Sequence, residues 1–163
     1  MKIQKIDAFG IDKAIGLIWE TFLKFEALDY SSEGVKSFQK FVEDKDILLE
    51  TEFFGAYENG EIRGVIATRN DRKHICCFFV KEQFQRQGIG RKLWEYVKNS
   101  SSHNIITVNS SPYAIPIYHK LGFTNTEAEQ LKDGIRYTPM EYKDGFKKYC
   151  QEFRAMGYEA LEE

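Results

Sequence analysis

Residues 80–94 read VKEQFQRQGIGRKLW, and this stretch decides how the rest of the chain is interpreted. It follows His74 to Val80, a nearly continuous apolar run that predicts a central strand covered on both faces. Gly88 and Gly90 come next, and the apolar positions after them recur at helical spacing. A glycine-rich turn between a strand and a helix lets backbone N–H groups and the helix dipole act on one spot. The stretch therefore predicts an anion-binding site.

The local charge supports a polyanionic ligand. Residues 81–98 contain five basic and two acidic side chains, a local charge of +3 in a chain whose net charge is -2. Two familiar glycine-rich sites fit poorly. A Walker-type loop needs Lys and then Ser or Thr after its second glycine, whereas Gly90 is followed by Arg91, which disfavours a nucleotide-dependent kinase. A dinucleotide fingerprint needs a third glycine where Leu93 stands.

The elements around this stretch predict a mixed α/β domain. Helical periodicity runs from Ile11 to about Leu28, and Ser31 or Ser32 can cap a second helix. Asn59-Gly60 predicts a tight hairpin. The segments Phe123 to Ala128 and Ile135 to Tyr142 predict a final hairpin joined around Asp133-Gly134.

The loop Gln85-Arg86-Gln87-Gly88-Ile89-Gly90 matches the Q/R-x-x-G-x-G loop of the GNAT superfamily of acetyltransferases. A second stretch, SSPYAIPIYHKLGF at 110–123, resembles the superfamily signature A-x-x-x-Y-x-x-x-G-F, and RYTPMEY at 136–142 resembles its closing strand. The chain is thus similar to bacterial-type GNAT acetyltransferases over roughly residues 52–142.

The resemblance implies an α/β (α+β) fold with a mixed, mostly antiparallel central sheet, helices on both faces and a splayed strand pair that holds acetyl-CoA. We expect one domain over residues 1–163, with acceptor-side helices in 1–50, an acetyl-CoA-binding core in 52–142 and an extra C-terminal helix in 143–163. Phe146, Tyr149, Cys150, Phe153 and Met156 form an apolar stripe on that helix. The stripe predicts a docked helix and not a free tail, either on the chain's own core or equally on a second subunit of a homodimer.

The resemblance also implies the residues that bind acetyl-CoA. They are Phe78, Val80, Gln85, Arg86, Gln87, Gly88, Ile89, Gly90, Arg91, Asn109, Ser111 and Tyr118. The Val80 N–H is expected to donate to the thioester carbonyl, as an oxyanion donor does. Ser111 stands where the family often has Asn, so a pantetheine contact there is expected from its shorter hydroxyl or from Asn109.

The implied reaction is acetyl transfer to a primary amine by direct attack in a ternary complex. Tyr118 is expected to be the general acid that protonates the departing thiolate, although it also fits a packing stripe of its helix. His74 or Glu26 is the candidate base, because either could take a proton from the amine. The alternative is a non-catalytic acetyl-CoA sensor or interaction module of the same fold.

The acceptor is expected to be a small-molecule or peptide amine. Residues 1–50 contain ten acidic and seven basic side chains, which mildly favours a cationic small molecule. The nearly balanced charge of the chain and its lack of a long apolar run predict no nucleic-acid partner and no membrane contact. Its three cysteines, two of them adjacent, suit the reducing cytoplasm. His74 and Cys76 would share one face of a strand, but no second pair of ligands at metal spacing occurs in the sequence, so no metal site is predicted.

Overall fold

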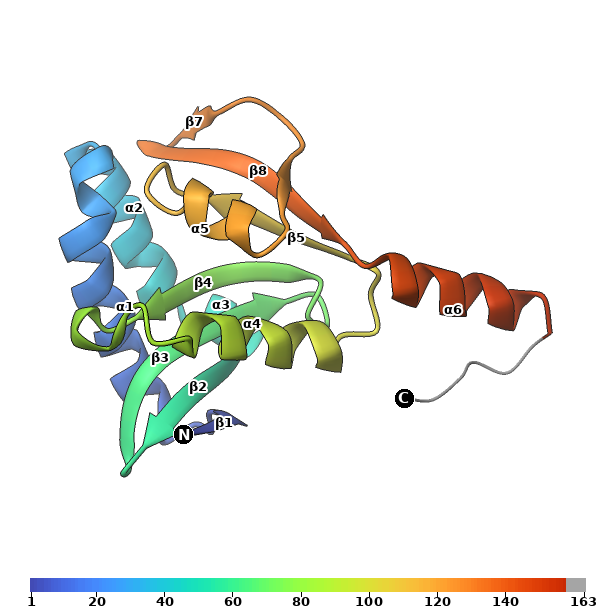
Figure 1. The fold of residues 1–163 in the computed structure, drawn as a ribbon. Coiled ribbons are helices and arrows are strands. Elements are labelled where there is room, and N and C mark those ends of the chain that lie inside the picture. The colour runs from blue at the N-terminus through green and yellow to red at the C-terminus, as the bar shows by residue number, and fades with distance from the viewer. Residues whose placement is uncertain (158–163) are drawn as a thin grey trace.

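The computed structural model describes residues 1–157 (Figure 1). Within them the strands form a sheet in the order β1-β2-β3-β4-β5-β8-β6, with β7 paired to β8. The strands are β1 (Lys2–Lys5), β2 (Glu52–Glu58), β3 (Glu61–Arg69), β4 (His74–Val80), β5 (Ile105–Ser110), β6 (Thr124–Asn125), β7 (Gln130–Lys132) and β8 (Ile135–Lys143). The helices are α1 (Ile11–Phe25), α2 (Ser32–Glu43), α3 (Lys45–Leu49), α4 (Ile89–Ser100), α5 (Ile115–Lys120) and α6 (Gly145–Ala155), with short 3₁₀ turns at Ala27–Asp29 and Glu82–Phe84.

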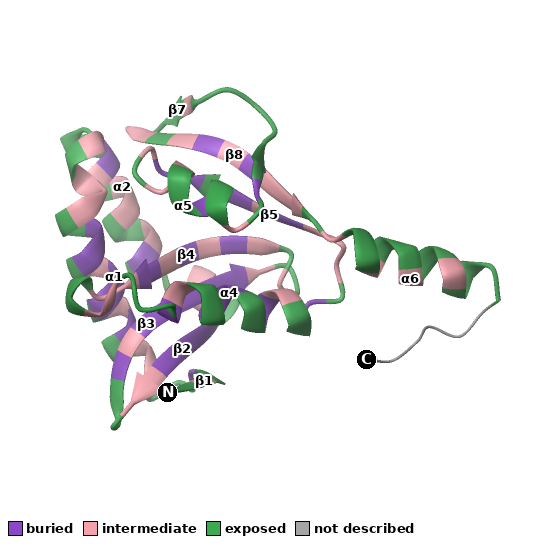
Figure 2. Ribbon diagram, viewed as in Figure 1, coloured by how far each residue is buried: buried purple, intermediate pink, exposed green. Residues whose placement is uncertain are grey.

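Neighbouring strands are antiparallel throughout, except for the parallel pair β4–β5. Each face of the sheet is covered by helices and has its own buried core. One core joins the sheet to α1 through Ile18 and Phe22 and to α2 through Val42, and the other joins it to α4 through Leu93 and Trp94. α4 and α5 cross in front of the sheet in Figure 1, and Figure 2 shows the buried positions along its central strands. The expected mixed, mostly antiparallel sheet with helices on both faces is confirmed.

Two local predictions are confirmed by backbone geometry. Asn59 and Gly60 join β2 to β3 with φ values of 53° and 75°, the left-handed conformation that a two-residue hairpin turn requires. Ser31 caps α2, because its side chain accepts a hydrogen bond from the Gly34 N–H at 3.2 Å.

The final hairpin differs from its prediction. β7 and β8 do turn around Asp133-Gly134, but the predicted strand Phe123 to Ala128 is strand only at Thr124–Asn125. Alternation of apolar residues did not reveal this break. The short helix α3 was also not predicted, although Asp44 caps it by accepting from the N–H groups of Asp46 and Ile47.

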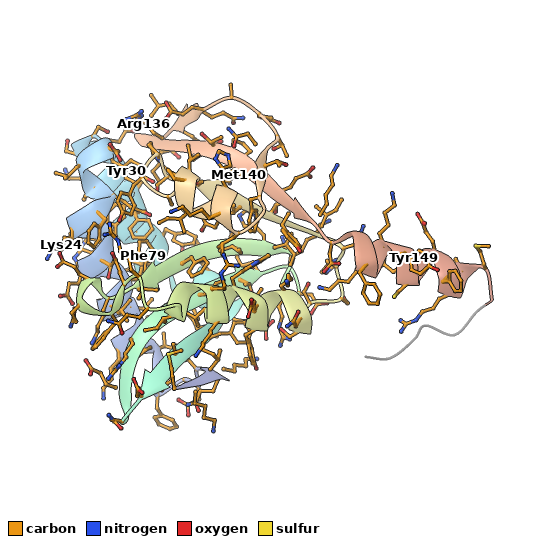
Figure 3. All side chains as sticks on the ribbon, in the orientation of Figure 1. Lys24, Tyr30, Phe79, Arg136, Met140 and Tyr149 are labelled. Carbon is orange, nitrogen blue, oxygen red and sulfur yellow. The ribbon has the colours of Figure 1, made fainter. Side chains whose placement is uncertain are left out.

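Of the two partners predicted for the apolar stripe of the C-terminal helix, the chain's own core does not bury it in the residues described, and contact with a second subunit stays a prediction. α6 has no buried residue, and Figure 1 shows it extending away from the sheet. Figure 3 labels Tyr149 on this helix, where it is 53% exposed. Polar contacts hold the start of α6, since the Lys147 Nζ donates to the carbonyls of Lys98 and His103. The predicted helix end at 158–163 lies outside the described residues.

Candidate functional site

The parallel strands β4 and β5 part early. They pair only at His74–Thr107 and Ile75–Val108, although both strands continue well beyond these positions. The register between β3 and β4 shifts by one residue, which leaves Cys76 as an extra residue on β4. Such a bulge bends the strand that carries it, so the bulge accounts for the separation of β4 from β5. The open end of this strand pair is the centre of the candidate site.

The backbone of β4 presents free polar groups to this opening. The Lys81 N–H donates to the Arg63 carbonyl at 2.9 Å, which makes Gly64–Val80 a non-hydrogen-bonded pair of the antiparallel ladder. The N–H of Val80 therefore points away from β3, toward the side from which β5 has departed. The same alternation turns the N–H and carbonyl of Phe78 toward the opening.

The glycine loop leads directly from β4 into α4. Gly88 is the residue before the helix, with φ 83°, and no side chain caps the first N–H groups of α4. A Cβ placed on Gly88 would meet no atom within 4 Å, so the loop is open at this point. Arg86 also adopts a left-handed φ of 62°. Uncapped N–H groups, an open loop and the helix dipole together suit an anion.

Several predicted binding residues of the loop make contacts within the protein. The Gln85 side chain donates to the Val80 carbonyl at 2.9 Å, and the Gln87 side chain donates to the Gln83 carbonyl at 3.4 Å. Arg91 reaches the Lys120 carbonyl at 3.5 Å, which links α4 to the end of α5. Ile89 is buried under the helix. These side chains shape the loop, and the N–H groups are left to face a ligand.

Two cavities meet at the opening between β4 and β5. The loop-side cavity, about 390 Å³, is lined by Phe84, Arg86, Gly88, Gly90 and Tyr113 among others. The aromatic cavity, about 380 Å³, lies on the side of α2 and β8 and is lined by Tyr30, Phe38, Phe41, Phe79 and Tyr137 among others. Figure 3 labels Tyr30 and Phe79 where α1 and α2 meet β4. Both cavities are lined by Glu26, Phe78, Phe79, Ala114 and Tyr118.

Tyr118 stands on α5 at the junction of the cavities. Its ring packs edge-on against Phe78, at 6.1 Å between centroids, and against Phe123 at 5.3 Å. Among the described residues its hydroxyl has no hydrogen-bond partner. Burial raises the pKa of the phenol well above its ordinary value, and the nearby Glu26 carboxylate raises it further. Tyr118 thus keeps its proton and has a free donor at the junction.

Glu26 faces the same junction from the end of α1. Its carboxylate accepts a hydrogen bond from the Ser111 hydroxyl at 2.9 Å. The pKa of Glu26 is raised to about 7, chiefly by burial. The hydrogen bond from Ser111 lowers the pKa in part, and the nearby charge of Asp29 raises it slightly. A carboxyl group with this pKa can accept a proton near neutrality. The structure therefore brings together Tyr118 and Glu26, the predicted acid and one of the two predicted bases.

His74 lies elsewhere in the aromatic cavity. Its Nδ1 is 2.7 Å from the Thr107 hydroxyl, at the end where β4 and β5 are still paired. Burial, and then the charge of Arg69, lower the pKa of this imidazole. Val80 follows six residues later on the same strand, which corresponds to about 20 Å of extended chain. His74 is therefore distant from the open end at which Val80 and the glycine loop lie.

The two residues proposed for a pantetheine contact also lie near the opening. Asn109 is exposed on β5 and lines the aromatic cavity. Ser111 is buried, and its hydroxyl accepts from the Ala114 N–H at 3.2 Å while it donates to Glu26. Sequence reasoning missed the pairing of Ser111 with Glu26. The sequence feature that could have revealed this contact is Ser111 itself, which stands where the family often has Asn, since a short hydroxyl leaves room for the carboxyl group.

Comparison with known proteins agrees with this geometry. The family model of the acetyltransferase (GNAT) domain matches residues 26–144. No curated protein matches the chain. A GCN5-related N-acetyltransferase from Rhodopseudomonas palustris has a similar fold, with a TM-score of 0.75 at 16% identity over 87% of this chain and 94% of that one.

Two further solved structures share the fold and were determined with a coenzyme. The PaiA N-acetyltransferase of Thermoplasma acidophilum in complex with coenzyme A has a TM-score of 0.66 at 20% identity, covering 87% of this chain and 98% of that one. YncA of Salmonella typhimurium, described as a putative acetyltransferase with acetyl-CoA, has a TM-score of 0.59 at 19% identity, covering 88% and 94%. Since the family model covers well over half of the sequence, the chain belongs to the GNAT acetyltransferase domain family.

Proposed function

We propose that this protein is an N-acetyltransferase that moves an acetyl group from acetyl-CoA to a primary amine by direct attack in a ternary complex. The observation that carries the proposal is the junction of the two cavities. There the Val80 N–H, the Tyr118 hydroxyl and the Glu26 carboxylate face one opening in the sheet. A cavity on either side leaves room for a donor and an acceptor at the same time.

The loop-side cavity suits the donor. Its uncapped α4 N-terminus and open glycine loop fit a diphosphate, and the solved relatives with coenzyme A and acetyl-CoA support this ligand class. The N–H and carbonyl of Phe78 and the N–H of Val80 can bond an extended pantetheine arm as a neighbouring strand would. The Val80 N–H then meets the carbonyl oxygen as negative charge develops on it.

Proton transfer is divided between the two sides of the junction. An alkyl ammonium has a pKa near ~10.4, so only about one molecule in ~2,500 is neutral at pH 7. Glu26 accepts the proton of the ammonium, directly or through water, and the neutral amine attacks the thioester. The C–N bond forms, the C–S bond breaks, and Tyr118 donates its proton to the leaving thiolate. The attacking nitrogen loses a second proton as it becomes an amide, and this proton returns to the Tyr118 phenolate, directly or through water. The same burial that keeps Tyr118 protonated also favours a neutral thiol over a thiolate.

Ligand-dependent stabilisation tests the donor half. Acetyl-CoA at about 100 times its dissociation constant is expected to stabilise the protein by about 2.7 kcal/mol, which raises the unfolding midpoint by roughly 5–10 °C. Differential scanning fluorimetry with acetyl-CoA, CoA, ATP and NAD measures this shift. A larger shift with ATP and magnesium than with acetyl-CoA would contradict the proposal.

Gly90→Leu is expected to weaken acetyl-CoA binding. Gly90 lies in the first turn of α4 and lines the loop-side cavity, and a Cβ there already lies 3.7 Å from the Phe78 ring. A leucine side chain fits a helix but occupies ligand space, so we expect a cost of about 1–3 kcal/mol, or about 5–150-fold in Kd. Isothermal titration calorimetry measures the affinity.

Gly16→Leu is the matched control for this variant. Gly16 is an exposed helical glycine of α1, and its Cβ would meet nothing within 4 Å. It should bind acetyl-CoA like the unmodified protein. Transfer to an amine panel then separates the enzyme from a binding module, because a sensor binds acetyl-CoA and acetylates none of the amines.

A further inference from the structure

The aromatic cavity contains an arginine whose charge is not neutralised. Arg69, at the end of β3, is half-buried and lines this cavity. Its Nε donates to the Cys76 sulfur at 3.0 Å, and its guanidinium lies 5.7 Å from the centre of the Phe41 ring. Within residues 1–157, Arg69 forms no ion pair, and its two terminal nitrogens have no hydrogen-bond acceptor.

The Arg69 guanidinium lies among aromatic side chains. The neighbouring walls of the cavity are formed by Phe38, Phe41 and Phe79. The ring centroid of Phe38 lies 6.2 Å from that of Phe41 and 6.3 Å from that of Phe79. A guanidinium in such apolar surroundings loses solvation, and a partner with a planar anionic group restores it through two parallel hydrogen bonds. An arginine in a protein interior ordinarily pairs with a carboxylate of the same protein. Here the cavity leaves those donors available to a ligand.

The other charged groups of the cavity define its polarity. Glu26 lies at the open end of the β4–β5 pair, next to Ser111. Arg69 lies at the paired end, since it is opposite His74 in the β3–β4 register. Lys132 and Asp133 are exposed where the β7–β8 turn meets the cavity. The interior therefore has a carboxyl group at one end and a cation at the other.

The length between these ends follows from the strand register. His74 pairs with Thr107, and Ser111 lies four residues later on the chain of β5. Four residues of extended chain span about 13 Å. Because the Arg69 and Glu26 side chains both line the cavity from these ends, the groups that they bind are closer together than this. A ligand that reaches both ends therefore carries its amine and its carboxylate at opposite ends of a linker that lies along the phenylalanine walls.

We propose that the amine acceptor is a small ω-amino carboxylate, with its amine at Glu26, its carboxylate on Arg69 and an apolar linker between the phenylalanine walls. The inference rests on the proposed acetyl transfer and names its substrate class. It replaces the purely cationic acceptor that the charge of residues 1–50 favours. Arg69 is a specificity-determining residue, since it contacts the end of the substrate that does not react.

A matched substrate series tests this assignment. The series compares straight-chain ω-amino carboxylates of increasing length with alkylamines and terminal diamines of the same length. At the best length, kcat/KM for the carboxylate is expected to exceed that for the alkylamine by about 10–100-fold, or about 1.4–2.7 kcal/mol, since hydrogen bonds between charged groups are the stronger ones. Diamines are expected to be the poorest, because their second cation meets Arg69.

Variants locate the origin of this preference. Arg69→Met is expected to bring the carboxylate-to-alkylamine ratio close to one, and Arg69→Lys to retain part of it through the remaining charge. Arg136→Met is the control, because Arg136 is paired with Glu129 and does not line the cavity. The unfolding midpoint and acetyl-CoA affinity of each variant check that the fold and donor site are intact.

The outcomes separate the two proposals. Equal rates for carboxylates and alkylamines overturn the substrate assignment and leave acetyl transfer standing. Loss of the ratio in Lys132→Met, with the ratio kept in Arg69→Met, also overturns it, because the anion is then held at the exposed turn. Acetylation of no amine at all, with acetyl-CoA bound, overturns the proposed function and the substrate assignment together.

Discussion

Tyr118→Phe is expected to lower kcat by about 10²–10⁴-fold while acetyl-CoA still binds. The substitution removes only the hydroxyl, which has no hydrogen-bond partner among the described residues, and keeps the ring that packs on Phe78 and Phe123. The thiolate then leaves without a positioned acid, and the factor is that of lost general acid catalysis. Steady-state kinetics with a thiol reagent for released CoA measures kcat, and calorimetry measures coenzyme affinity.

A tyrosine outside the site provides the control for this experiment. Tyr96 lies on α4, where its ring contacts Phe54 at 5.3 Å, and it lines neither of the two cavities. Tyr96→Phe should retain full activity. If Tyr118→Phe also retained full kcat with every acceptor, the phenol would be a packing residue and the acid assignment would be wrong.

The parts of this molecule that could be predicted from sequence are those fixed by short-range chemistry. Asn59-Gly60 determines its hairpin because both residues tolerate positive φ, and Ser31 determines the start of α2 by capping it. The glycine loop belongs to the same class, since Gly88 adopts its left-handed φ within a short local motif. Each of these signals needs only a few neighbouring residues.

The features that sequence could not give depend on contacts between distant segments. The extra residue at Cys76 opens the β4–β5 pair, and nothing in the run His74–Val80 marks it. Ser111 and Glu26 are 85 positions apart, so only the fold brings them into contact. The amphipathic stripe of α6 predicts a covered face without stating what covers it, and in the described helix Phe146, Tyr149 and Met156 of this stripe are exposed.

Glu26→Gln is expected to lower kcat/KM at neutral pH by about 10²-fold or more, and to remove the inflection near pH 7 from its pH profile. Glutamine can still accept from the Ser111 hydroxyl, so the geometry is kept while the base is lost. In the unmodified protein the rate should rise as the carboxyl group ionises at its pKa of about 7. In the variant it should rise only with the amine's own deprotonation.

Glu20→Gln is the matched control, since Glu20 is exposed on the same helix α1. It should keep both the rate and the inflection. Should Glu26→Gln keep the inflection, another group titrates there and Glu26 is not the base. In that case His74→Asn becomes the decisive variant, because His74 is the other titratable candidate in the cavity.

The stability of Glu26→Gln tests the same pKa without any turnover. The carboxyl group titrates at about 7 in the folded chain and at 4.5 in the reference state, so between these values the folded state binds more protons than the unfolded state. The free energy of unfolding therefore falls as pH rises through this window, by about 1–3 kcal/mol for this group. Glutamine cannot ionise, so the variant should match the unmodified protein near pH 4 and exceed its stability at pH 8. Urea unfolding at both pH values measures the difference. Equal stability of the two proteins at pH 8 would mean that burial does not raise the pKa of Glu26.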